Sequence, residues 1–136
     1  TSNWSRQRTM VGVISNAQYQ ARVTMSDGRM QVVGSGNYTV SAPALPSVSV
    51  AVSPGTVRAG QNMNFTASLS QGVGVAKVEL VFPAANVVEA MQANSATSWS
   101  RTRTMSGVIA AAQYQVKVTM SDGRVQVASG SYAVTK

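Results

Sequence analysis

Residues that could perform acid–base or metal chemistry are few in this chain of 136 residues. It contains no histidine and no cysteine, and its only carboxylates are Asp27, Glu79, Glu89 and Asp122. Histidine-dependent triads, histidine or thiolate metal sites and thiol catalysis are therefore excluded. Each aspartate precedes a glycine in a turn pattern, and neither glutamate has an evident acidic partner, so paired-carboxylate catalysis is unsupported. We expect a protein that is not an enzyme and has no metal site and no cofactor.

Basic and aromatic residues form a motif with binding chemistry, Trp-x-Arg-x-Arg-x-Met, which occurs twice. The residues of this candidate stripe are Trp4, Arg6, Arg8, Trp99, Arg101 and Arg103. On an extended strand the tryptophan and its two arginines share a face. Such a stripe would bind polyanions, including acidic glycans and nucleic acid, or would stack a sugar or base. The favoured alternative is a strand face whose arginine stems cover the indole. The sequence leaves open whether Trp99 or the pair Ser100 and Thr102 faces the core.

The motif belongs to a longer internal repeat. Residues 4–33 align without gaps to residues 99–128, and 22 of these 30 positions are identical. Self-similarity on this scale is typical of an array of similar domains.

The centre of the repeat predicts a β-hairpin in each copy. Apolar and polar residues alternate along 17–25 and 112–120, which places one face of the strand in a core. Each strand then meets an Asp-Gly pair, Asp27-Gly28 or Asp122-Gly123, which suits a two-residue type I′ turn. That turn predicts that Met25 faces Met30 and Val23 faces Val32. In the second copy the same register pairs Met120 with Val125 and Val118 with Val127, all directed inward.

Past the hairpin the two copies differ by one residue. The first copy reads Val33 to Tyr38 where the second reads Ala128 to Tyr132. The extra residue changes the alternation, so we expect a glycine-assisted β-bulge in at least one copy.

The remaining pattern divides the chain into three parts. Residues 1–40 carry three strand signals (3–10, 17–25 and 30–40), residues 41–46 form a proline-containing linker, and residues 47–136 carry seven. In the last part we expect strands at 48–53, 63–69, 76–82, 99–105, 112–120 and 125–134, with a weaker one within 86–93. The predicted fold class is all-β, a Greek-key β-sandwich preceded by the last three strands of another copy.

Three runs of the chain resemble bacterial immunoglobulin-like modules (Big or fibronectin-III-like) of secreted and cell-surface proteins. They are Pro54–Ala67, Val75–Leu80 and Gln113–Gly123. The resemblance covers 47–136 fully and 1–40 as the end of a preceding copy. It implies an immunoglobulin-like fold, an extracellular, cell-surface or virion-surface location, and roles as spacer, adhesin, filament subunit or phage decoration. It implies no catalytic or ligand residues.

Composition agrees with a β-rich repeat outside the cytoplasm. Only 11% of the residues are charged, the net charge is +7, and no apolar run approaches the length of a membrane span. We expect a structural or assembly module of a surface fibre or filament, with a carbohydrate- or polyanion-binding module or a phage-surface decoration as alternatives. Forty residues bury too little apolar surface to fold alone. We therefore expect either that the chain is a segment of a longer tandem array or that residues 1–40 are completed by strands of another chain. The strands of 47–96 could be completed by 97–136 or, in a permuted arrangement, by 1–40, and we expect the first.

Overall fold

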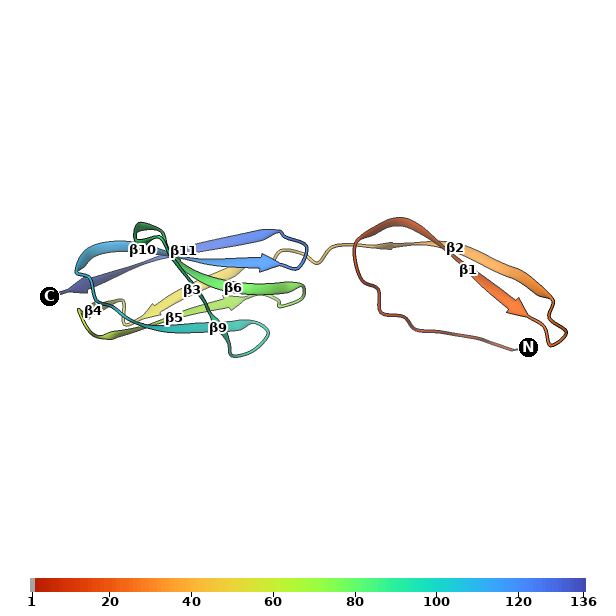
Figure 1. Ribbon diagram of the computed structural model, residues 1–136, viewed down its shortest axis with the longest axis horizontal. Helices are drawn as coiled ribbons and strands as arrows, with labels where there is room; N and C mark the ends of the chain where they lie inside the picture. Colours follow the sequence, from red (N-terminus) through yellow and green to blue (C-terminus); the bar gives the residue numbers. More distant parts are fainter. Residues whose placement is uncertain (1) are drawn as a thin grey trace. The chain divides into compact units, whose positions relative to one another are not determined.

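The computed structural model describes residues 2–136 and is all-β apart from one short 3₁₀ turn, η1 (Pro83–Ala85). The chain divides into two compact units, residues 1–43 (unit 1) and 44–136 (unit 2). Figure 1 labels their strands.

Unit 2 contains nine strands in two sheets. They are β3 (Val48–Ser53), β4 (Thr56–Arg58), β5 (Asn62–Leu69), β6 (Val75–Phe82), β7 (Val87–Ala90), β8 (Gln92–Ala93), β9 (Ser98–Thr104), β10 (Ile109–Met120) and β11 (Val125–Thr135). One sheet has the order β4-β11-β10-β6-β7, and the other has the order β3-β5-β9-β8. All neighbouring strands are antiparallel except β4 and β11, which are parallel. The weak strand expected within 86–93 is two short strands, β7 and β8, one in each sheet.

Alternation along the strands creates the core between these sheets. In β5 the residues Met63, Phe65, Ala67 and Leu69 are buried, as predicted, and the residues between them are more exposed. On β6, Val78, Leu80 and Phe82 are likewise buried, whereas Ala76 is exposed. Burying one such large apolar side chain contributes about 1.5–3 kcal/mol to folding.

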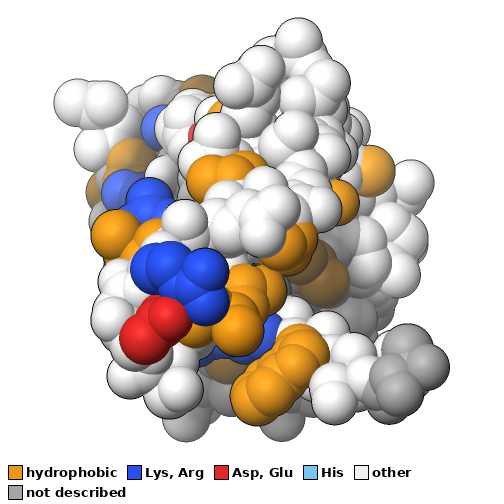
Figure 2. Space-filling view, turned by 90° about the vertical axis from the view of Figure 1, so that its right-hand side faces the viewer, with side chains coloured by type: hydrophobic (Ala, Val, Ile, Leu, Met, Phe, Trp, Pro, Cys, Tyr) orange, Lys and Arg blue, Asp and Glu red, His pale blue; other side chains and the backbone are white. Residues whose placement is uncertain are grey.

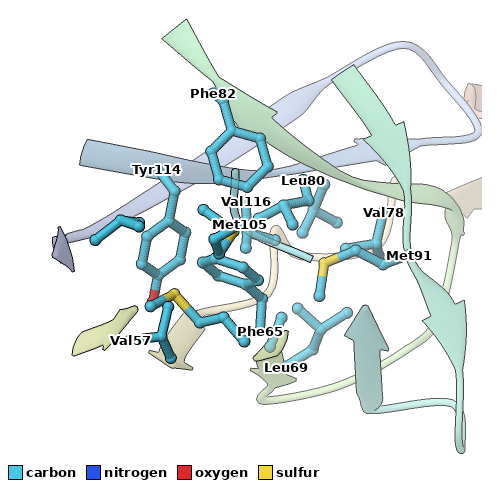
Figure 3. Packing of buried hydrophobic residues seen from close by; sticks show 14 of the residues in the cluster. Val57, Phe65, Leu69, Val78, Leu80, Phe82, Met91, Met105, Tyr114 and Val116 are labelled. Carbon is cyan, nitrogen blue, oxygen red and sulfur yellow. The ribbon is translucent and has the colours of Figure 1, made fainter. Parts of the chain in front are cut away.

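An aromatic cluster holds the two sheets together. The ring of Phe65 on β5 meets three rings of the facing sheet edge to face, with centroid distances of 4.9 Å to Tyr114, 5.4 Å to Phe82 and 6.0 Å to Tyr132. Figure 3 shows Phe65, Phe82 and Tyr114 converging in this core. Such edge-to-face pairs add stability beyond the area they bury.

The two Asp-Gly turns are at the predicted positions, but each is longer by one residue than predicted. In the second copy the Met120 N–H donates to the Arg124 carbonyl at 2.8 Å, and the Gly123 N–H donates to the Met120 carbonyl at 3.0 Å. This is a three-residue loop with a left-handed glycine, since Gly123 has φ +90° and Gly28 has φ +89°. Each aspartate also accepts hydrogen bonds from the backbone N–H and the Nε of the arginine two residues later.

The longer loop makes the predicted register wrong by one residue. Thr119 pairs with Val125, Val118 with Gln126, and Lys117 with Val127. Val125 and Val127 therefore lie on the outer face, where they are 41% and 47% exposed. From Gln126 to Tyr132 the pairing of the second copy is regular, and its register shifts only between Ile109 and Ala112, opposite Tyr132 to Val134.

The expected irregularity occurs in the first copy. Unit 1 consists of a hairpin of β1 (Ile14–Thr24) and β2 (Met30–Val40). Its register shifts between Ala21 and Arg22, because Ala21 pairs with Gly34 and Arg22 with Val32. Val33, next to the glycine, is left without a partner residue, and the extra residue of the first copy is absorbed there.

The strand predicted at 3–10 does not form, since residues 2–13 contain no strand. Its counterpart β9 is a strand in unit 2 because it pairs with β5 on one side and β8 on the other. In unit 1, residues 2–43 contain no strands equivalent to β5 and β8. A chain with the same alternation therefore lacks the backbone partners that an extended strand requires.

Candidate functional site

The second copy of the candidate stripe lies on the inner face of its sheet. Trp99 is opposite Ala67, Arg101 opposite Phe65, and Arg103 opposite Met63. Directly paired residues point to the same side of a sheet, and those three partners are fully buried. The tryptophan and both arginines thus face inward, which answers the question that the sequence left open.

Ser100 and Thr102 occupy the outer face of β9. The Ser100 hydroxyl hydrogen-bonds to the side chain of Asn94, and the Thr102 hydroxyl donates to the Asn64 Oδ1 at 3.3 Å. These cross-strand polar pairs stabilise an exposed sheet face.

A carboxylate of the opposite sheet holds the two inward arginines. Glu89 on β7 accepts from Arg103 Nη1 at 2.6 Å, and its other oxygen lies 3.4 Å from Arg101 Nε. The Arg103 guanidinium also lies over the Phe82 ring, 4.8 Å from its centroid. The Glu89 side chain is only 24% exposed, so this group of three charges is partly desolvated and joins the two sheets at their edge.

The site forms at this edge because strand β8 is short. It covers only Trp99 and Ser100 of β9. Beyond these residues β9 is the edge of its sheet, and β7 is the edge of the other. Charged side chains can therefore close the core here while their ends reach water.

The first copy of the stripe is in a different state. Trp4 is 92% exposed, and Arg6 and Arg8 are exposed as well. Within residues 2–136, neither arginine has a carboxylate at ion-pair distance. Both line a surface depression of about 510 Å³ together with Met10, Tyr19 and Tyr38. The described residues of unit 1 include no strand equivalent to β7, and hence no counterpart of Glu89.

Two titratable groups have shifted pKa values, both in the second hairpin. Burial raises the pKa of the Tyr114 hydroxyl. The backbone N–H of Arg124 lowers the pKa of Asp122, and the guanidinium of the same residue adds to this effect. Tyr114 belongs to the core and Asp122 to the turn, so these shifts describe structural roles.

Among the described residues, no three acidic, histidine or cysteine side chains gather into a group that could hold a metal ion. In the same part of the chain, no helix has the length and apolar character that crossing a bilayer requires. No protein-family model matches the chain, and no curated protein sequence is significantly similar to it.

Glu89 is the functional residue that the sequence reasoning missed. It has no evident acidic partner, and its basic partners, Arg101 and Arg103, lie on a strand of the other sheet. One signal was present, because Glu89 shares its alternation with Val87 and Met91, and Met91 is buried. A charge on the apolar face of a strand indicates an inward ion pair.

Proposed function

We propose that this protein is a non-enzymatic structural module of a repeat protein, working by assembly of β-sandwiches at a cell or particle surface. The observation that carries the proposal is the repeat itself. One copy is folded into a core in unit 2, while the same residues in unit 1 lie on an open face. A chain that repeats core-forming strands in this way is built for assembly with further strands.

The strand order supports an immunoglobulin-like fold for unit 2. The first strand is divided between the sheets, with β3 in one and β4 beside the last strand β11 in the other. The orders β3-β5-β9-β8 and β11-β10-β6-β7 correspond to the ABED and GFC arrangements of such sandwiches, with one added edge strand. This agrees with the bacterial modules that the sequence resembles. The low content of charged residues, with Ser, Thr, Gln and Asn on the solvent faces, supports an extracellular location.

A fusion protein tests the proposal. Residues 44–97 are joined ahead of Asn3, which aligns with Ser98, so that unit 1 receives the strands it lacks in the natural order. We expect calorimetry to show a second cooperatively folded unit, with about twice the unfolding enthalpy of the original chain. In the control fusion the added segment carries Phe65→Asp. An unfolding enthalpy equal to that of the control would refute the proposal.

Polyanion binding is the second candidate, and the unpaired arginines of unit 1 favour it. Arg6 and Arg8 lie beside an exposed tryptophan, whereas Arg101 and Arg103 share Glu89. Retention on heparin should therefore depend on the first pair. Retention that survives Arg6→Ala with Arg8→Ala would dismiss the stripe of unit 1, and retention that survives Arg101→Ala with Arg103→Ala would dismiss the stripe of unit 2.

A further inference from the structure

Side chains buried in unit 2 are exposed at the equivalent positions of unit 1. Figure 2, which faces unit 1, shows apolar side chains grouped at the surface beside basic ones. The paired exposed fractions are 55% for Tyr19 against 1% for Tyr114, 42% for Val23 against 0% for Val118, and 52% for Met25 against 2% for Met120. Surface apolar groups of this density mark an interaction site.

The backbone of the unit 1 hairpin is also open at both edges. In unit 2, β10 pairs with β6 and β11 pairs with β4, so the hairpin continues into a sheet on each side. In the described part of the chain, β1 and β2 pair only with each other. Their outward N–H and C=O groups can accept added strands.

The open face matches what residues 44–97 cover in unit 2. Many residues that face the core of unit 2 are identical at the aligned positions of unit 1. These pairs include Trp4/Trp99, Arg6/Arg101, Arg8/Arg103, Met10/Met105, Ile14/Ile109, Ala17/Ala112, Tyr19/Tyr114, Val23/Val118, Met25/Met120, Tyr38/Tyr132 and Val40/Val134. Two inward positions differ, because Ala21 stands where the second copy has Val116, and Gly34, which pairs with Ala21, stands where the second copy has Ala128. Tyr19 even lies across Gly36 as Tyr114 lies across Gly130, so the local packing of the hairpin is the same in both units.

Charge, as well as shape, indicates which strands can cover the open face of unit 1. Arg6 and Arg8 correspond to the two arginines that Glu89 holds, and the described residues offer them no carboxylate. A partner with the strands of 44–97 brings Glu89 to this position. A second unit 1 packed on the first would bring four more arginines and a single acid, Asp27, which already pairs with Arg29, and this disfavours that occupant.

We propose that unit 1 is a docking face for strands β3–β8 of a further copy of the repeat, carried on a separate polypeptide with the chemistry of residues 44–97. The pairing of its Glu89 with Arg6 and Arg8 fixes the register of the added strands. The inference rests on the proposed function, and it adds the partner and the residues that recognise it.

The experiment titrates the isotope-labelled chain with a peptide of residues 44–97 joined to a soluble carrier protein. The peptide contains no tryptophan, and the chain contains two. We expect one peptide per chain, a shift of the Trp4 indole signal, an unchanged Trp99 signal, and slowed amide exchange in β1 and β2. A chain of residues 44–136 should not bind the peptide.

Two matched double variants identify the recognising charges. Arg6→Gln with Arg8→Gln should weaken binding by about tenfold or more, whereas Arg101→Gln with Arg103→Gln should leave the affinity within about twofold. Conversely, Ala21→Val restores the side chain of Val116 and should tighten binding by about tenfold through the apolar area it buries.

Three outcomes would overturn the inference. The first is a shift of Trp99, which means exchange into unit 2. The second is a concentration-dependent shift of Trp4 without peptide, which means that the occupant is a second unit 1. The third is no binding to unit 1. If binding fails while the fusion of 44–97 ahead of Asn3 folds, the proposed function stands and only docking from a separate polypeptide is wrong. If the fusion also fails, both are wrong.

Discussion

The ring of Tyr114 lies across the backbone of Gly130 on the neighbouring strand, so closely that a Cβ built on this glycine would be 2.5 Å from the tyrosine hydroxyl oxygen. The tyrosine fills the space that the glycine leaves in the sheet, and its ring meets that of Phe65 edge to face. Glycine at this position is therefore a packing requirement of the core.

Gly130→Ala should destabilise unit 2 by about 1–3 kcal/mol, because neither the buried tyrosine nor the strand can move without cost. The matched variant is Gly36→Ala, where the added Cβ would meet Tyr19 in the same way. Since Gly36 and Tyr19 both belong to unit 1, this second change should alter the unfolding free energy of unit 2 by less than about 0.5 kcal/mol. Urea unfolding measures both, and equal effects would show that the tyrosine–glycine contact does not depend on the core.

Glu89→Gln should lower the unfolding free energy of residues 44–136 by about 1–2 kcal/mol. It leaves Arg101 and Arg103 facing inward without a carboxylate, and the partial exposure of the three side chains keeps the loss below that of a fully buried pair. The control is Lys77→Gln, whose ion pair with Glu79 leaves the lysine 59% exposed. It should cost about 0.5 kcal/mol or less. If the Glu89 variant is no less stable than this control, the ion pairs of Glu89 with Arg101 and Arg103 do not stabilise unit 2.

The turn predicts how the stability of unit 2 depends on acid. Hydrogen bonds from Arg124 lower the pKa of Asp122 below its ordinary value of 3.8 in the folded state. A carboxyl group with a lowered pKa stabilises the fold above its ordinary pKa, and this contribution is lost as the pH falls through the folded value. Urea unfolding of residues 44–136 should therefore show a smaller fall in stability below pH 3.8 for Asp122→Asn than for the parent chain. A larger fall in the variant would contradict this assignment.

Alternation and turn chemistry predicted most of unit 2 from the sequence. Strands such as β5 bury every second side chain, so the alternation in the sequence is enough to predict that Phe65 belongs to the core. The register was not predictable to one residue, because Asp-Gly suits both two- and three-residue hairpin loops. The choice between them decides whether Val125 and Val127 face the core or the solvent.

Unit 1 and the charge group were beyond local pattern reasoning. Residues 2–13 have the alternation of a strand, but a strand also needs neighbouring strands to pair with. The counterpart β9 pairs with β5 and β8, and the alternation within residues 2–13 gives no information on such partners. Glu89 and Arg103 are 14 residues apart but belong to different sheets, and only the packing of the two sheets brings them together. The orientation of Trp99 followed once its partner in the ladder, Ala67, was known.

Amide hydrogen exchange of the dilute, monomeric chain tests the central claim most directly, because the two hairpins have nearly the same sequence. If unit 1 is an open face that awaits strands, the amides of β1 and β2 should exchange rapidly, while the equivalent amides of β10 and β11 are protected up to the global unfolding of unit 2. Comparable protection of both hairpins in the monomer would mean that residues 1–43 form a complete structure by themselves, and would contradict the account.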